Sequence, residues 1–466
     1  MKQIIKIHAI SLFLIMLSQN IFAQNTREQI YITFEEAISR SLTENKQLRA
    51  SRYGVKKYEW QKWSAWTQLF PRVTFNTRYT WIDDSTFALR DFSRYFQDDQ
   101  SPFGIKIPQT VFQEAFFTEI DVSLTLFNGA LLYGLFIAGA NEDMAEYSDE
   151  STRRNIIFLT IKNYLDILKN EEILKLQQEY LNLSRLNYQK AERLYQAGRY
   201  SKAEVLRWKV EEQQQQSMLV NSESVLRSTQ STLCRIMNLD MRTNLQVDPK
   251  IPQPILEESG NLSKMSTGEI LQLIQIEDAA LIEANATLSV ARKNEEVSKL
   301  LYKNAYTGYM PTLSLTYSYA WRENNTIELD DYSPQTLMIN LSIPLFTSFQ
   351  NLSNVKSQYY AYKQSRESFE DELQNTRLIL TQTVNNLLNL RTQKELSAVN
   401  VQYTERNYRI VEQQKEQGLV SNIDFIDAKL NLQNARLTDI SNQYDFITTM
   451  VELYYLLGDL KSIVAY

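Results

Sequence analysis

Two long stretches of this chain of 466 residues contain no proline, and they restrict most strongly what it can fold into. They run from residue 109 to 248 and from 345 to 466. Because proline interrupts the interior of a helix, these stretches can form helices much longer than those of ordinary globular domains. One uninterrupted helix over 131–197 would contain 67 residues, a length of about 100 Å at 1.5 Å per residue.

Each proline-free stretch contains an isolated glycine, in "LYQAGRYSKAEVLRW" and in "KEQGLVSNIDFIDAK". Glycine readily adopts the left-handed conformation that ends a helix, while serine at an N-cap with an acid at N3 begins the next one. Both stretches have this spacing, in Gly198, Ser201 and Glu204 and in Gly418, Ser421 and Asp424. We therefore predict two helical hairpins with tips at 198–201 and 418–421.

The two hairpins belong to a tandem repeat. Pro311 and Trp321 follow Pro71 and Trp81 by 240 residues, and the tip glycines are 220 residues apart. A period of this size is too long for a solenoid and indicates two similar halves of one molecule. We expect a first repeat over 24–246, a linker over 247–264 and a second repeat over 265–466.

Four segments alternate apolar and polar residues, and we predict strands at about 69–82, 117–127, 311–322 and 336–346. In the first segment, Val73, Phe75 and Trp81 share one face and Arg72 and Asn76 the other. Such alternation over about ten residues is typical of transmembrane β-barrel strands. A soluble antiparallel sheet would explain it equally well. The aromatic residues at the strand ends and the polar opposite face favour the membrane.

The first 23 residues have the pattern of a secretory signal peptide. Lys2 and Lys6 precede an apolar run, and Ala23 offers a small residue for cleavage. No later run of 18 apolar residues exists, so a membrane-inserted form of this chain requires a β-barrel. Four strands cannot close a barrel, so it must be shared between chains.

Composition excludes several classes of function. Cys234 is the only cysteine and His8, within the expected signal peptide, the only histidine, so histidine–acid catalysis and Cys/His metal sites are nearly excluded. The net charge is −6 without a basic cluster, which argues against nucleic acid as a partner. We predict no enzyme activity, no cofactor and no metal.

The last helix has a coiled-coil seam, because nine residues follow one another at alternating spacings of four and three. These are Ile426, Leu430, Gln433, Leu437, Ile440, Tyr444, Ile447, Val451 and Tyr454. A helix packed on a soluble bundle would show the same seam. The lengths of the predicted helices favour a coiled structure.

In this order, the signal peptide, paired strands, long helices and G-x-x-S-x-x-[DE] tips resemble the TolC family of outer membrane efflux proteins. The resemblance implies a mainly α fold with a transmembrane β-barrel, of which a trimer closes twelve strands. It also implies a location in the outer membrane with a helical tunnel extending into the periplasm. The chain would be a passive exit duct that docks a periplasmic adaptor and an inner-membrane pump of the RND or ABC type. The alternative is a periplasmic coiled-coil scaffold without channel activity.

The resemblance also implies roles for residues near the tips. Asp424 and Asp427 match acids that ring the narrow end of the tunnel, and Glu204 occupies the matching place in the first repeat. The tip residues that would dock the adaptor are Gly198, Arg199, Tyr200, Ser201, Gly418, Leu419, Val420 and Ser421. Where relatives carry an arginine and a tyrosine that latch the closed end, this chain has Val420 and Lys415. We expect a different latch, in which Lys415 and Arg199 pair with the acids.

Three tryptophans precede the first strand, at Trp60, Trp63 and Trp66. Tryptophan is enriched at membrane interfaces, so these rings are candidates for setting the depth of insertion. Packing between helices is an equally good interpretation, because the positions 240 residues later are Leu300, Lys303 and Tyr306.

Overall fold

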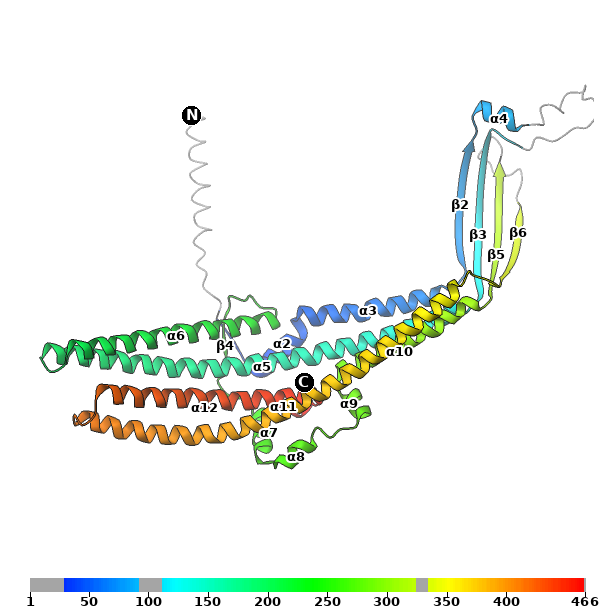
Figure 1. Ribbon diagram of the computed structural model, residues 1–466. Helices are drawn as coiled ribbons and strands as arrows, with labels where there is room; N and C mark the ends of the chain where they lie inside the picture. Colours follow the sequence, from blue (N-terminus) through cyan, green and yellow to red (C-terminus); the bar gives the residue numbers. More distant parts are fainter. Residues whose placement is uncertain (1–28, 92–110, 324–333, 465–466) are drawn as a thin grey trace, which may run out of the picture. The chain divides into compact units, whose positions relative to one another are not determined.

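A computed structural model describes residues 29–91, 111–323 and 334–464 of the chain (Figure 1). The predicted signal peptide, 1–23, lies outside the described residues. The chain divides into two compact units. The helical unit comprises residues 1–51, 149–286 and 374–466, and the sheet unit comprises 52–148 and 287–373. Each unit therefore contains segments from both copies of the predicted repeat.

The sheet unit contains four antiparallel strands in the order β2-β3-β5-β6. They are β2 (Arg72–Trp81), β3 (Glu114–Asn128), β5 (Thr312–Glu323) and β6 (Gln335–Ser342). Each half of the chain supplies one hairpin, and β3 joins β5 in the middle, with Ile120 opposite Tyr319. Within the described residues, β2 and β6 each pair with one neighbour only. The sheet therefore has two open edges.

The strands lie close to the predicted ranges, with one clear difference. β6 ends at Ser342, four residues before its predicted end. Pro344 follows, and it has no backbone N–H to donate and also restricts the residue before it. The chain then turns through Ser348 and Phe349, whose φ angles of 50° and 64° are unusual for residues other than glycine.

Long helices dominate the rest of the chain, as the proline-free stretches predict. α5 (Gly129–Gln196) has 68 residues and α11 (Gln350–Glu416) has 67. In the sheet unit, α3 (Lys46–Thr67) leads to β2, while α10 (Ala286–Ala305) and the short η2 (Tyr306–Tyr309) lead to β5. A short helix, α4 (Asp84–Arg90), follows β2.

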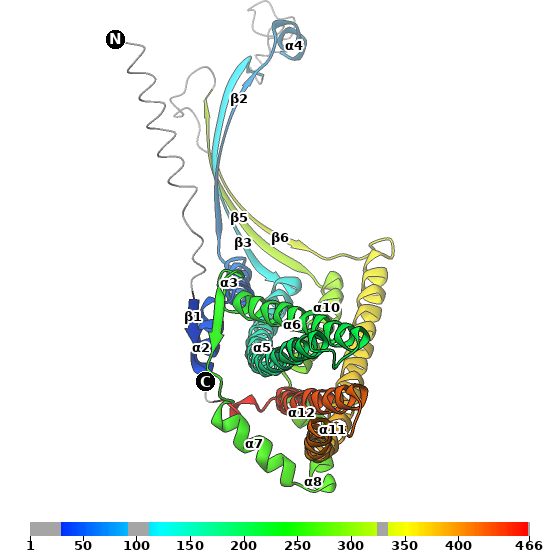
Figure 2. The same cartoon turned by 90° about the vertical axis from the view of Figure 1, so that its left-hand side faces the viewer.

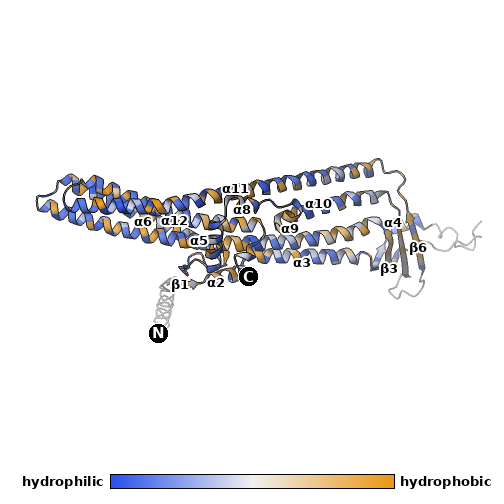
Figure 3. Ribbon diagram, turned by 90° about the horizontal axis from the view of Figure 1, so that it is seen from below, coloured by the Kyte–Doolittle hydropathy of each residue, from blue (hydrophilic) through white to orange (hydrophobic). Residues whose placement is uncertain are grey.

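The helical unit contains a bundle of four helices. α5 turns back into α6 (Lys202–Ile236), and α11 turns back into α12 (Asn422–Leu456). Figure 2 views this bundle from the side of the tips. Apolar and polar residues are interspersed along these helices in Figure 3. All nine residues of the predicted α12 seam are buried or half-buried. No helix in the described part of the chain is apolar over a length that could span a membrane.

Short elements surround the far end of this bundle. β1 (Gln29–Ile32) and β4 (Asn244–Val247) form a parallel pair, next to α2 (Phe34–Glu44). α7 (Gln253–Lys264), α8 (Thr267–Gln272), α9 (Asp278–Ala284) and η3 (Leu460–Ser462) complete the unit. The predicted linker, 247–264, thus contains a helix. Cys234, near the end of α6, is fully buried, and this burial raises the pKa of its thiol to about 11.

Candidate functional site: the two hairpin tips

Both tips have the same backbone turn. The φ angles are 72° at Gly198 and 73° at Gly418. After each glycine, the next N–H donates to a carbonyl five residues earlier, from Arg199 to Leu194 at 2.8 Å and from Leu419 to Gln414 at 2.9 Å. A Cβ atom at either glycine would meet nothing within 4 Å. Glycine is therefore needed for the left-handed φ and not for lack of space.

Both tips also have the same cap on the following helix. The Ser201 hydroxyl accepts from the Glu204 N–H at 3.3 Å, and the Glu204 carboxylate accepts from the Ser201 N–H at 3.0 Å. At the second tip the matching distances between Ser421 and Asp424 are 3.2 and 3.1 Å. These reciprocal bonds are capping boxes, as the spacing of serine and acid predicts.

Asn422, the first residue of α12, joins the two tips. Its Nδ2 donates to Glu204 Oε1 at 2.6 Å. Its Oδ1 accepts from the Tyr200 hydroxyl at 3.4 Å and from Lys415 Nζ. The side chain is buried, although it lies beside an exposed turn. Sequence reasoning missed this residue because its partners lie in α6, in α11 and in the turn of the other tip.

The three predicted gate acids have different surroundings within one chain. Asp424 and Asp427 are exposed, and Glu204 is half-buried. Hydrogen bonds from Ser421, with a smaller contribution from the charge of Lys415, lower the pKa of Asp424. Burial lowers the pKa of Lys415 in turn. Asp424 thus caps its helix while still presenting a carboxylate to solvent.

The expected pairs between the tip cations and the acids do not form within one chain. Among the ion pairs of the described residues, none joins Lys415 or Arg199 to Asp424, Asp427 or Glu204. Lys415 donates instead to Asn422 and lies 6.0 Å from the centre of the Tyr200 ring. The amide oxygen of Asn422 is thus the partner of Lys415, where we expected the carboxylate of an acid.

The tip residues predicted to dock a partner are mostly accessible. Tyr200 and Val420 are half-buried, whereas Leu419 is 69% exposed. The remaining ones are exposed: Gly198, Arg199, Ser201, Gly418 and Ser421. The two tips therefore present different side chains on one backbone turn, a cation on the first and a leucine on the second.

An aromatic cluster lies inside the bundle, next to the tips. Trp208 and Phe425 are buried with ring centres 6.1 Å apart, and Tyr408 lies 5.6 Å from Phe425. Ala191 and Ile426 complete the buried set. This cluster draws on all four helices of the bundle, so both hairpins share one core next to the tips.

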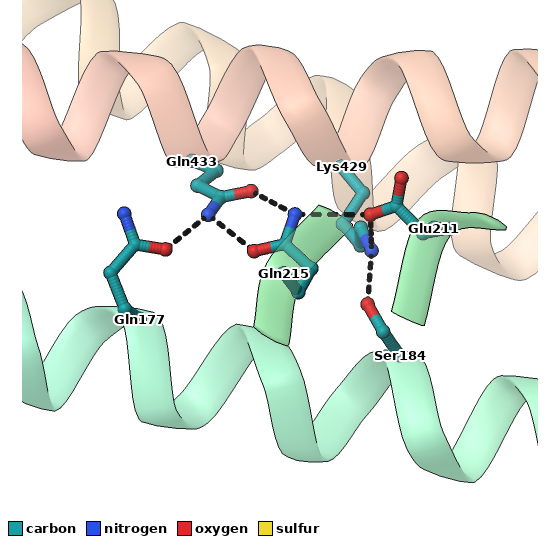
Figure 4. A network of polar contacts seen from close by, with 6 residues as sticks. All are labelled: Gln177, Ser184, Glu211, Gln215, Lys429 and Gln433. Carbon is teal, nitrogen blue, oxygen red and sulfur yellow. Dashed lines mark hydrogen bonds and ion pairs between the residues drawn. The ribbon is translucent and has the colours of Figure 1, made fainter. Parts of the chain in front are cut away.

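A buried polar network lies further along the bundle (Figure 4). It joins α5, α6 and α12 through Gln177, Ser184, Glu211, Gln215, Lys429 and Gln433. The predicted seam contained Gln433 but not Lys429. A lysine is rarely buried unless it is paired, and its partner is 218 residues away. No group of three or more His, Cys, Asp or Glu residues that could hold a metal was found among the described residues.

Comparisons with known proteins agree with this architecture. The profile of the family described as Outer membrane efflux protein matches residues 37–239 and 279–459. The TolC protein of Salmonella enteritidis is 23% identical over 194 residues, 38% of each chain. The TolC protein of Vibrio cholerae is 24% identical over 199 residues, 39% of this chain and 44% of that protein. Each of these matches thus spans less than half of the curated relative.

Solved structures match over more of the chain. The CmeC outer membrane channel of Campylobacter jejuni superposes with a TM-score of 0.76 at 13% identity, over 92% of this chain and 86% of that one. The outer membrane protein VceC of Vibrio cholerae gives 0.74 at 14% identity, over 91% and 96%. The fold is therefore that of outer membrane channels.

The chain belongs to the outer membrane efflux protein family, whose profile matches most of its length. This confirms the predicted resemblance. It also confirms the predicted location in the outer membrane with an extension into the periplasm. The family consists of channel proteins.

Proposed function

We propose that three copies of this chain close a twelve-stranded barrel in the outer membrane and form a passive exit duct. The duct would serve a tripartite efflux or type I secretion system, whose inner-membrane pump, of the RND or ABC type, supplies the energy. A periplasmic adaptor would dock at the hairpin tips. The observation that carries this proposal is the four-stranded sheet with two open edges.

The exposed side chains of the sheet support insertion in lipid. Val73 and Phe75 on β2 are 64% and 66% exposed, and Leu337 and Ile339 on β6 are 66% and 65% exposed. An open sheet edge with unpaired backbone groups cannot remain in lipid. Pairing β6 of one chain with β2 of the next removes every edge, and three chains leave room for a lumen.

An exposed seam on α11 supports association of the helical units. Leu396, Val399, Tyr403 and Ile410 follow one another at spacings of three, four and seven residues, and each is exposed. Leu206 and Val210 are likewise exposed on α6, one turn apart. Apolar heptad positions facing solvent are typical of helices that pack against a second chain. Neighbouring copies of this chain supply the missing partners.

The assembly can be tested on protein extracted from membranes. We expect one trimeric species in mild detergent, measured by light scattering, and cation-conducting channels in planar bilayers. A folded, monodisperse monomer without conductance would contradict the duct. Release from membranes without detergent would instead support the periplasmic scaffold, which needs the long helices but not the exposed sheet.

A further inference from the structure

We propose that Lys429 and Glu211 are positioning residues that hold the start of α12 in one register on α6 and α5. The inference about register rests on the bundle alone. Its consequence for the gate rests on the proposed function, because Asp424 and Asp427 lie on this part of α12.

The first observation is a constant spacing between α6 and α12. Three pairs of polar side chains connect the two helices by hydrogen bonds, and each pair is separated by 218 residues. They are Glu204 with Asn422, Glu211 with Lys429 and Gln215 with Gln433. Both helices start at a tip, so they run parallel. A constant separation in such a pair defines a single register.

The second observation is the burial of the charged pair. Lys429 Nζ lies 2.6 Å from Glu211 Oε1, and the two side chains are 0% and 5% exposed. Every other ion pair in the described part of the chain leaves at least one side chain exposed by 27% or more. A charge buried to this extent is tolerated only while its partner remains in place.

The third observation is that the network around the pair is well satisfied. Lys429 Nζ also donates to Ser184 Oγ at 2.8 Å, which adds α5 to the contact. Gln215 Nε2 donates to Glu211 at 3.1 Å and to Gln433 at 2.9 Å. Gln433 Nε2 donates to Gln215 at 2.8 Å and to Gln177 at 2.9 Å. Burial lowers the pKa of Lys429 against the opposing effect of Glu211.

These contacts distinguish one register from its neighbours. A slip of α12 by one helical turn would bring Lys429 opposite Gln215 in one direction or Arg207 in the other. Either slip separates the buried lysine from its carboxylate. An apolar seam penalises such a slip much less, because one aliphatic side chain can replace another. In other helical assemblies, the best-documented role of buried polar residues is to fix the register between packed helices.

The pair therefore sets the height of the gate acids. Asp427 lies two residues and Asp424 five residues before Lys429 on the same helix. While the pair is intact, the tip halves of both hairpins of one chain move together. Opening of the narrow end would then require motion between chains, or rupture of the pair.

Hydrogen exchange and single-channel recording test the inference on the full-length protein in detergent and in bilayers. The main variant is Lys429→Met with Glu211→Met, which removes both charges and fills the space of the two side chains with apolar atoms of similar volume. We expect it to fold but to exchange amides over 422–436 at least about ten-fold faster than the wild type. In bilayers we expect several conductance levels where the wild type shows one.

Two further variants separate positioning from packing. The exchanged pair, Lys429→Glu with Glu211→Lys, should restore slow exchange and a single level, since the charges remain opposite each other. The control is Lys169→Met, which removes a partly exposed pair with Asp445 between α5 and α12. It should change neither readout near the tips.

Wild-type exchange and a single conductance level in the double methionine variant would overturn the inference. So would failure of the exchanged pair to restore either readout. If the wild type forms no channels at all, the proposed function fails, while the exchange comparison still decides the register. The two proposals can thus fail separately.

Discussion

The two halves of the chain share their backbone at the tips and differ in the side chains that surround it. Each tip has a glycine with φ near 72°, a serine cap and an acid. Position 422 is a buried asparagine, whereas the matching position in the first half is the exposed Lys202. The comparison shows that the repeat preserves the turn, while the second half carries the contacts that join both tips.

The largest effect should come from removing that joining residue. Asn422→Ala leaves Glu204 and Lys415 without their shared partner, which should cost about 1–3 kcal/mol. Lys202→Ala, at the matching exposed position, should change stability by less than about 0.5 kcal/mol. Unfolding in denaturant measures both. Equal effects would show that the two halves contribute alike.

Substitution of the tip glycines should have the next largest effect. Valine at Gly418 or Gly198 must adopt an unfavourable φ, which should cost about 1–2 kcal/mol locally. We expect roughly ten-fold less adaptor to co-purify with an otherwise intact trimer. Gly139→Ala in α5, where a Cβ meets nothing within 4 Å, is the control and should be neutral or stabilising by about 0.5–1 kcal/mol. Normal adaptor binding by both valine variants would exclude the tips from docking.

The predicted gate acids should affect ion selectivity more than stability. In a trimer, Asp424 and Asp427 would contribute six carboxylates, and like charges about 10 Å apart repel by roughly 1–2 kcal/mol before screening. Replacing both by alanine should weaken cation selectivity and relieve block by trivalent cations. Glu204→Gln should have a smaller effect, because hydrogen bonds already hold that carboxylate. Unchanged block in the double variant would place the ring elsewhere.

Low pH should destabilise the second tip in the wild type more than in a variant with a neutral side chain at position 424. Folding lowers the pKa of Asp424. The ionised carboxylate therefore stabilises the folded state fully above the pKa of the unfolded chain, about 3.9. This stabilisation is lost as the pH falls through the lower pKa of the folded state. Asparagine at this N3 position can still accept from the Ser421 N–H through its amide oxygen but does not titrate. Between pH 6 and 2, Asp424→Asn should therefore lose less thermal stability than the wild type. Parallel curves would contradict this role of the carboxylate.

The smallest effect concerns the sheet unit, where the halves also differ. Trp60, Trp63 and Trp66 are 67%, 53% and 45% exposed on α3. If they lie at the lipid interface, brominated lipid should quench them, and replacement of all three by phenylalanine should remove that part of the quenching. Of the three remaining tryptophans, Trp81 and Trp321 lie in strands, and Trp208 is buried in the helical unit. The same quenching in wild type and variant would favour packing against another chain.

Local signals explain what could be predicted from sequence. A glycine, a serine and an acid at fixed spacing determine a tip through bonds over at most five residues, so both tips were predictable. The burial of Lys429 could not be predicted. The seam spacing selects its neighbour Leu430, and the burial of Lys429 depends on Glu211 in another helix. The β1–β4 pair was missed for a similar reason, since each strand has only four residues and its partner is distant in the chain.

Cys234 has a consequence for a protein that works in an oxidising compartment. A lone thiol on the surface there is liable to form disulfides between molecules or to be oxidised. The side chain of Cys234 is fully buried, and burial raises the pKa of its thiol to about 11, so little of the nucleophilic thiolate is present at pH 7. Burial and the raised pKa thus both slow the reactions of this thiol. A cysteine introduced at a tip can therefore be labelled selectively without first removing the native one.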